Sequence, residues 1–104
     1  MDIAEWRKRI DELDRRLVEL LNARALAAKE IGKLKRDTKL PVYEPDREKV
    51  IHENVRKHNR GPLPDAALMH IYERIIDVMR KLQRDEIGER SKAAAGETEL
   101  EPKD

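Results

Sequence analysis

The apolar residues in the first third of the chain recur at alternating steps of three and four, and this pattern constrains the fold more than any other feature. They are Ile3, Trp6, Ile10, Leu13, Leu17, Leu20, Ala27, Ile31 and Leu34. Such spacing places side chains along one seam of an α-helix. Asp2 can cap the start of this helix, and nothing interrupts the pattern until about Arg36. The sequence therefore predicts one helix of roughly 33 residues, about 50 Å long.

A helix of this length cannot be covered by the rest of so short a chain. The chain has 104 residues, and a compact domain of that size has a radius of gyration of about 13 Å. Two further helices folded against the first would leave part of its apolar seam exposed, so we expect a second copy of the chain to cover it. The predicted fold is all-α: a three-helix protomer with a long first helix, in an intertwined homodimer.

The middle of the chain predicts a loop and a short second helix. Residues 38–44 form the loop, and Pro45 fits the first position of a helix, where its missing amide hydrogen is no loss. This helix is expected to end at about His58. Residues 59–64 contain one glycine and two prolines, which indicate a turn.

The last part of the chain predicts a third helix and a tail. Asp65 is a candidate cap for this helix, which is expected to fade after about Glu86. From Gly88 onward small and charged residues predominate, which is typical of a disordered tail or a linker remnant. We therefore expect a helical domain at residues 1–87 and a tail at residues 88–104.

The composition argues against several classes of function. The chain has 23 Lys and Arg against 22 Asp and Glu, so its formal net charge of +1 gives no general attraction to nucleic acid or membrane. It has no cysteine, and Ser91, its single serine, lies in the predicted tail, so the folded part offers neither nucleophile. His52, His58 and His70 lack the spacing of metal ligands. We expect a soluble, cytoplasmic protein without metal or cofactor.

Two cations of the first helix, Arg24 and Lys35, face the same side of it, although a cation near a helix C-terminus, as at Lys35, is also favourable by itself. Arg24 interrupts the seam between Leu17 and Ile31, so its side chain must find anions or extend out of the core toward water. Lys35 lies on the same side of the helix, some 16 Å further along it. Arg7 lies about 25 Å from Arg24 on the same helix, so the two can share a site only if an antiparallel partner chain supplies Arg7.

Polar residues of the other two helices suggest the rest of a site. Arg47 and Glu48 occupy the first turn of the second helix, where a cation is unfavourable unless an anion lies nearby. Gln83 places an amide on the apolar line of the third helix. Together with Arg24 and Lys35, these residues predict a pocket with several cations, one carboxylate and one amide. Such a pocket suits a compact ligand with at least two carboxylates.

Three segments of the sequence resemble the all-α (AroQ) class of chorismate mutases. They are WRKRIDELDRRLVELLNARALAAKEIGKLK, PVYEPDREKVI and IIDVMRKLQ, and the similarity covers residues 5 to about 84. The resemblance implies a homodimer that converts chorismate to prephenate, in the biosynthesis of phenylalanine and tyrosine, by a Claisen rearrangement without a cofactor.

The resemblance also implies a role for each residue of the site. Arg24 and the other protomer's Arg7 would hold the two carboxylates of the substrate, with Arg47 shaping the site. Lys35 and Gln83 would donate hydrogen bonds to the ether oxygen, and Glu48 would accept one from the ring hydroxyl. Two substrate-binding positions depart from the family pattern: Glu44 stands where an Asp is frequent, and Met79 stands where a small hydroxyl residue can occur.

Other functions remain open from the sequence. Isochorismate pyruvate lyase resembles the same class and uses a similar cationic pocket. A nucleic-acid module would use Lys33, Lys35, Arg36 and Lys39 as a basic patch, and a purely structural helical dimer would need a Glu partner for Arg24. The enzyme hypothesis also allows association with another shikimate-pathway enzyme.

Overall fold

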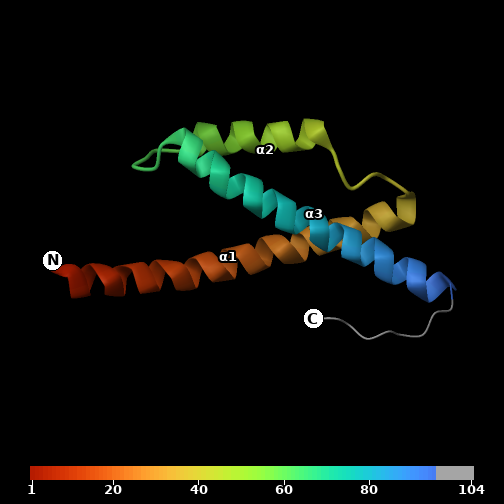
Figure 1. Ribbon diagram of the computed structural model, residues 1–104, viewed down its shortest axis with the longest axis horizontal. Helices are drawn as coiled ribbons and strands as arrows, with labels where there is room; N and C mark the ends of the chain where they lie inside the picture. Colours follow the sequence, from red (N-terminus) through yellow and green to blue (C-terminus); the bar gives the residue numbers. More distant parts are fainter. Residues whose placement is uncertain (96–104) are drawn as a thin grey trace.

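The chain folds into three α-helices. The computed structural model describes the backbone of residues 1–95 and the side chains of residues 1–88. In chain order the helices are α1 (Ile3–Thr38), α2 (Pro45–His58) and α3 (Asp65–Ala95), and the described residues include no strand (Figure 1). The predicted all-α protomer with a long first helix is therefore confirmed.

Both ends of α1 are set by local interactions. The amide of Glu5 donates to Oδ1 of Asp2 over 2.9 Å, and the amide of Asp2 donates to Oε1 of Glu5 over 2.9 Å. This reciprocal pair satisfies two amides that the helix leaves without partners, as the prediction of Asp2 as the cap requires. At the other end Lys39 adopts a left-handed conformation with φ of 60°, which stops the helix after 36 residues.

The second helix has the predicted bounds, whereas the third differs from prediction at both ends. Asp65 is the first residue of α3 rather than the residue before it, and its carboxylate accepts a hydrogen bond from the Asn59 amide over 2.7 Å. The helix does not fade after Glu86 but continues past Gly88 to Ala95. Alanine and lysine in this stretch favour helix without needing a buried face, which the prediction did not weigh. The rest of the expected tail, residues 96–104, lies outside the described residues, and the division at residue 87 stays a prediction.

The third helix packs across the C-terminal half of α1, and α2 packs on α3 (Figure 1). The crossing is close at Gly32, where an added Cβ atom would lie 2.9 Å from the Cα of Gln83. Ala28, Ile76 and Met79 form the small buried apolar core beside this crossing.

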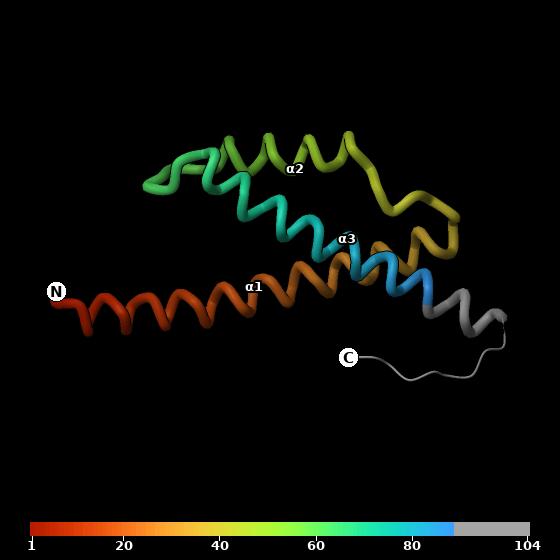
Figure 2. The backbone as a smooth tube through the Cα atoms, viewed as in Figure 1, coloured from red at the N-terminus to blue at the C-terminus, as the bar shows by residue number. Residues whose placement is uncertain are grey.

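The N-terminal half of α1 extends away from the other helices (Figure 2). Every residue from 1 to 20 is exposed, including Trp6 at 55% and Leu17 at 51%. The radius of gyration is 17.8 Å, well above the value of about 13 Å for a compact chain of this length. A single chain thus leaves its apolar seam uncovered, as the length of the helix suggested, and the homodimer stays a prediction. No helix within residues 1–95 contains a stretch long and apolar enough to span a membrane.

Candidate active site

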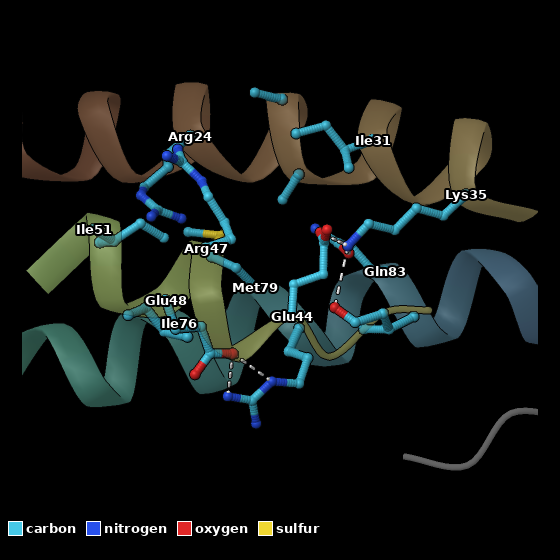
Figure 3. A pocket seen from close by; sticks show the side chains of 14 residues that line it. Arg24, Ile31, Lys35, Glu44, Arg47, Glu48, Ile51, Ile76, Met79 and Gln83 are labelled. Atoms are coloured by element: carbon cyan, nitrogen blue, oxygen red, sulfur yellow. Dashed lines mark hydrogen bonds and ion pairs between the residues drawn. The ribbon is translucent and has the colours of Figure 1, made fainter. Parts of the chain in front are cut away.

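A cavity of about 370 Å³ lies between the C-terminal half of α1, the loop before α2, the first turns of α2, and α3 (Figure 3). This volume is in the range of small-molecule sites. Its walls include apolar side chains from all three helices: Ile31, Ile51, Ile76 and Met79. Its polar lining consists of Arg24, Lys35, Glu44, Arg47, Glu48, Arg80 and Gln83.

The cavity brings together all but one of the residues proposed from the sequence. The exception is Arg7, which lies in the exposed N-terminal half of α1 and does not line this cavity. Helical periodicity explains why Arg24 and Lys35 reach the same cavity, since both face one side of α1. The polar residues of α2 and α3 line the same cavity because of how the three helices pack.

Lys35 is the most enclosed charge of the site, with 7% of its surface exposed. Its Nζ donates to the carbonyl oxygen of Val42 over 3.1 Å and to Oε1 of Gln83 over 3.0 Å. It also lies 2.7 Å from Oε1 of Glu44. Because the oxygen of the Gln83 amide accepts from Lys35, the nitrogen of that amide is the group left to donate to a ligand.

The close crossing at Gly32 places Gln83 beside Lys35. Gly32 is one turn before Lys35 on α1, and its missing side chain leaves room for the backbone of α3 at Gln83. A larger residue would hold the two helices further apart. The sequence analysis did not identify Gly32, although a glycine inside a strong helical pattern is a signal of close packing.

Arg24 and Arg47 lie together at the end of the cavity opposite Lys35 (Figure 3). Arg24 is half-buried and Arg47 is exposed. Within the part of the chain that the structure describes, neither guanidinium forms an ion pair with a carboxylate, unlike Lys35 with Glu44 and Arg80 with Glu48. The Glu partner that a purely structural role of Arg24 would need is thus not found among those residues. The two groups form a positive end of the cavity that favours a bound anion.

Arg80 is a site residue that the sequence analysis missed. Its Nη2 and Nε donate to Oε2 of Glu48 over 2.6 and 3.1 Å. The guanidinium also contacts Asp77 and lies over the Tyr43 ring, 5.2 Å from its centroid. The hydrogen bond with Glu48 is the main cause that raises the pKa of Arg80 above its ordinary value, with burial opposing it. Both bonds use one oxygen of Glu48, so Oε1 remains available to a ligand.

Sequence signals for Arg80 were present but weak. It directly follows Met79 and lies three residues before Gln83, so helical spacing puts it near the same face. Arg80 lies at the edge of the apolar stripe and neither interrupts nor continues it, so the apolar pattern does not single it out.

The lining has more positive than negative charge. Four cations, Arg24, Lys35, Arg47 and Arg80, face two carboxylates, Glu44 and Glu48. The difference of two positive charges suits a ligand with two negative charges. Among residues 1–88, no group of three or more His, Cys, Asp or Glu side chains is arranged to hold a metal ion. The arrangement offers binding, orientation and hydrogen-bond donors rather than a nucleophile.

Comparison with known proteins connects this site to a family. Residues 6–84 match the family model for chorismate mutase type II. The chain belongs to the type II chorismate mutase family. Among solved structures, the chorismate mutase (form II) from Thermus thermophilus has a TM-score of 0.77 and 30% sequence identity, over 79% of this chain and 93% of that one.

Two relatives differ in how much of their length the chain spans. The chorismate mutase of Methanocaldococcus jannaschii is 31% identical over 88 residues, which cover 84% of this chain and 89% of the relative. The bifunctional chorismate mutase/prephenate dehydratase of Aquifex aeolicus is 39% identical over 87 residues, which cover 80% of this chain. This chain spans only 24% of the length of that bifunctional relative.

Proposed function

We propose that the protein is a chorismate mutase that rearranges chorismate to prephenate in this cavity. The observation that carries the proposal is the distribution of polar groups in the cavity. Arg24 and Arg47, whose guanidinium groups have no carboxylate partner among the described residues, lie at one end, and Lys35 and Gln83 lie at the other. Membership of the type II family supports it. The reaction would serve phenylalanine and tyrosine biosynthesis in the cytoplasm.

Binding would use the excess positive charge of the lining. Chorismate has two carboxylates, and guanidinium groups suit them because their N–H donors match the two oxygens of a carboxylate. Arg24 and Arg47 would hold one end of the substrate. The apolar walls would hold the enolpyruvyl group above the ring, a reactive conformer that is scarce in water.

Catalysis would come from donors that face the developing charge. In the rearrangement the ether C–O bond breaks while a C–C bond forms, and the ether oxygen gains negative charge. Lys35 and the Gln83 amide nitrogen would donate to this oxygen and so stabilise the transition state more than the ground state. The free Oε1 of Glu48 would accept from the ring hydroxyl. No covalent intermediate and no cofactor is needed.

A second copy of the chain would complete the site. The apolar seam of α1 is exposed over residues 3–20, with Ile10 at 53% and Leu13 at 44%, and burying it against another α1 would be favourable. In an antiparallel pair, Arg7 of one protomer would reach the cavity of the other and bind the second carboxylate. The bifunctional relatives support a further proposal, that the protein associates with another enzyme of the same pathway.

The test is the loss of chorismate absorbance, with prephenate identified as the product. We expect turnover by the wild-type protein and a fall in kcat/KM of at least about tenfold for Arg24→Ala, because hydrogen bonds to charged groups contribute about 1.5–3 kcal/mol. Arg60→Ala, in the exposed turn after α2, is the matched control and should retain wild-type activity. Circular dichroism would show that both variants keep their helices.

A folded wild-type protein that leaves chorismate unchanged would refute the proposed function. Isochorismate would then be the next substrate, with pyruvate release as the measurement of lyase activity.

A further inference from the structure

Lys35 has three polar contacts in the cavity, two hydrogen bonds and one ion pair. A lysine ammonium has three N–H groups. The ammonium of Lys35 donates hydrogen bonds to the carbonyl of Val42 over 3.1 Å and to the amide oxygen of Gln83 over 3.0 Å, and it forms an ion pair with the carboxylate of Glu44 at 2.7 Å. An anionic ligand that approaches Lys35 therefore competes with these partners for its ammonium group.

The three partners are not equally easy to displace. The Val42 acceptor is a backbone carbonyl, and Gln83 is fixed by the close crossing of α3 over Gly32. Glu44 lies in the loop before Pro45, and its side chain is 47% exposed. Its carboxylate does not cap α2, and the ion pair with Lys35 is its one polar side-chain contact among the described residues. Glu44 is the partner that can leave at the lowest cost.

We propose that Glu44 is an internal counterion that occupies Lys35 in the free protein and that the anionic substrate displaces. Figure 3 shows its carboxylate inside the cavity next to Lys35. This inference rests on the proposed function, because it concerns the same Lys35 donor. It assigns Glu44 the opposite role from the sequence interpretation, in which Glu44 binds the substrate. A competing carboxylate raises KM, since part of the binding free energy is used to displace it.

The kinetic test compares two conservative variants. Glu44→Gln removes the competing charge and keeps the size of the side chain, so we expect KM for chorismate to fall by about three- to tenfold with kcat unchanged or higher. Asp46→Asn is the matched control: it removes one negative charge from the first turn of the same helix, outside the cavity lining. The control separates loss of the Lys35 contact from a general change in charge, so its KM should stay close to that of the wild-type protein.

A binding test makes the result independent of turnover. Malate, a small dicarboxylate, would be titrated into the wild-type protein and both variants while NMR follows the side-chain amide of Gln83. We expect malate to bind about three- to tenfold more tightly to Glu44→Gln than to the wild-type protein, and equally to Asp46→Asn.

The outcomes separate this inference from the proposed function. If the wild-type protein does not convert chorismate, the proposed function fails, and the malate titration alone decides the role of Glu44. An unchanged or weaker malate affinity in Glu44→Gln overturns the inference whatever the kinetics. With turnover present, a KM that is unchanged or higher in Glu44→Gln also overturns it, and a higher KM would assign Glu44 to substrate binding.

Discussion

Substituting Gly32 with alanine tests whether the close crossing of α1 and α3 positions the catalytic donors. The new Cβ would lie 2.9 Å from Cα, 3.3 Å from Cβ and 3.3 Å from the carbonyl oxygen of Gln83. Two of these atoms belong to the backbone and the third is the Cβ atom of Gln83, so no rotation of a side chain relieves the contact. Moving from 2.9 Å to the 3.4 Å at which ordinary contact begins requires a shift of roughly half an ångström.

The shift should affect activity more than stability. Overpacking costs about 1–3 kcal/mol, whereas alanine inside a helix gains about 1 kcal/mol over glycine, so the net loss of folding free energy should be about 0–2 kcal/mol. Gln83 would move relative to Lys35, and the 3.0 Å bond between them would lengthen. Because a misplacement of about 1 Å can reduce a rate about 100-fold, we expect kcat/KM to fall about ten- to a hundredfold.

Gly88→Ala is the matched control. Gly88 is also inside a helix, but a Cβ atom there would meet nothing within 4 Å. This variant should keep wild-type activity and gain up to about 1 kcal/mol. The measurements are thermal unfolding by circular dichroism and the chorismate absorbance assay on the same preparations. If Gly32→Ala matched Gly88→Ala in both thermal stability and kcat/KM, the crossing would not constrain Gln83, and the proposed positioning of Gln83 beside Lys35 by Gly32 would be wrong.

Four further predictions concern the Gln83 donor, the Arg80–Glu48 pair and the exposed seam of α1. Gln83→Glu should lower kcat/KM at pH 7, because a carboxyl group must be protonated to donate a hydrogen bond and Lys35 favours its charged form. The activity of this variant should rise by up to about tenfold per pH unit as the pH falls toward 5, whereas the wild-type profile should stay nearly flat from about pH 5 to 8. A flat profile for the variant would contradict the donor role of Gln83. Arg80→Met should lower kcat/KM about tenfold by releasing Glu48, as steady-state kinetics would show. Because the pKa of Arg80 is raised, the wild-type pair contributes stability below the ordinary arginine pKa and loses it only in stronger alkali, so pH scans of unfolding between about pH 6 and 9 should show no transition from this pair. Leu17→Glu should place a charge in the exposed seam of α1 and give monomers in sedimentation experiments; a dimer that persists would refute the proposed interface.

Much of the fold follows from interactions within a few residues along the chain. Asp2 and Glu5 cap α1 through side-chain and backbone groups three residues apart, and Pro45 starts α2 because of its own ring. The position of Arg24 within an apolar seam depends only on the helical repeat. Such features could be predicted because a helix fixes the direction of its side chains whatever it packs against.

The end of α3 shows that a helix can extend beyond the last residue of its apolar pattern. The prediction ended the helix where apolar residues run out, at about Glu86, but the helix continues to Ala95, and the alanines of that stretch favour helix. Loss of a buried face and loss of helical structure are separate events, and the periodic pattern reports only the first.

Which polar groups meet was decided by tertiary structure. The sequence by itself placed Lys35, Glu44 and Gln83 on three different segments, and the family resemblance implied that all three would bind one ligand. Only the packing of α3 over Gly32, and the path of the loop before α2, brought the other two within hydrogen-bond distance of Lys35. Tertiary packing also paired Arg80 of α3 with Glu48 of α2, 32 residues away in the sequence. The physical reason is that side-chain direction is a local property of each helix, whereas the distance between helices depends on the atoms of both.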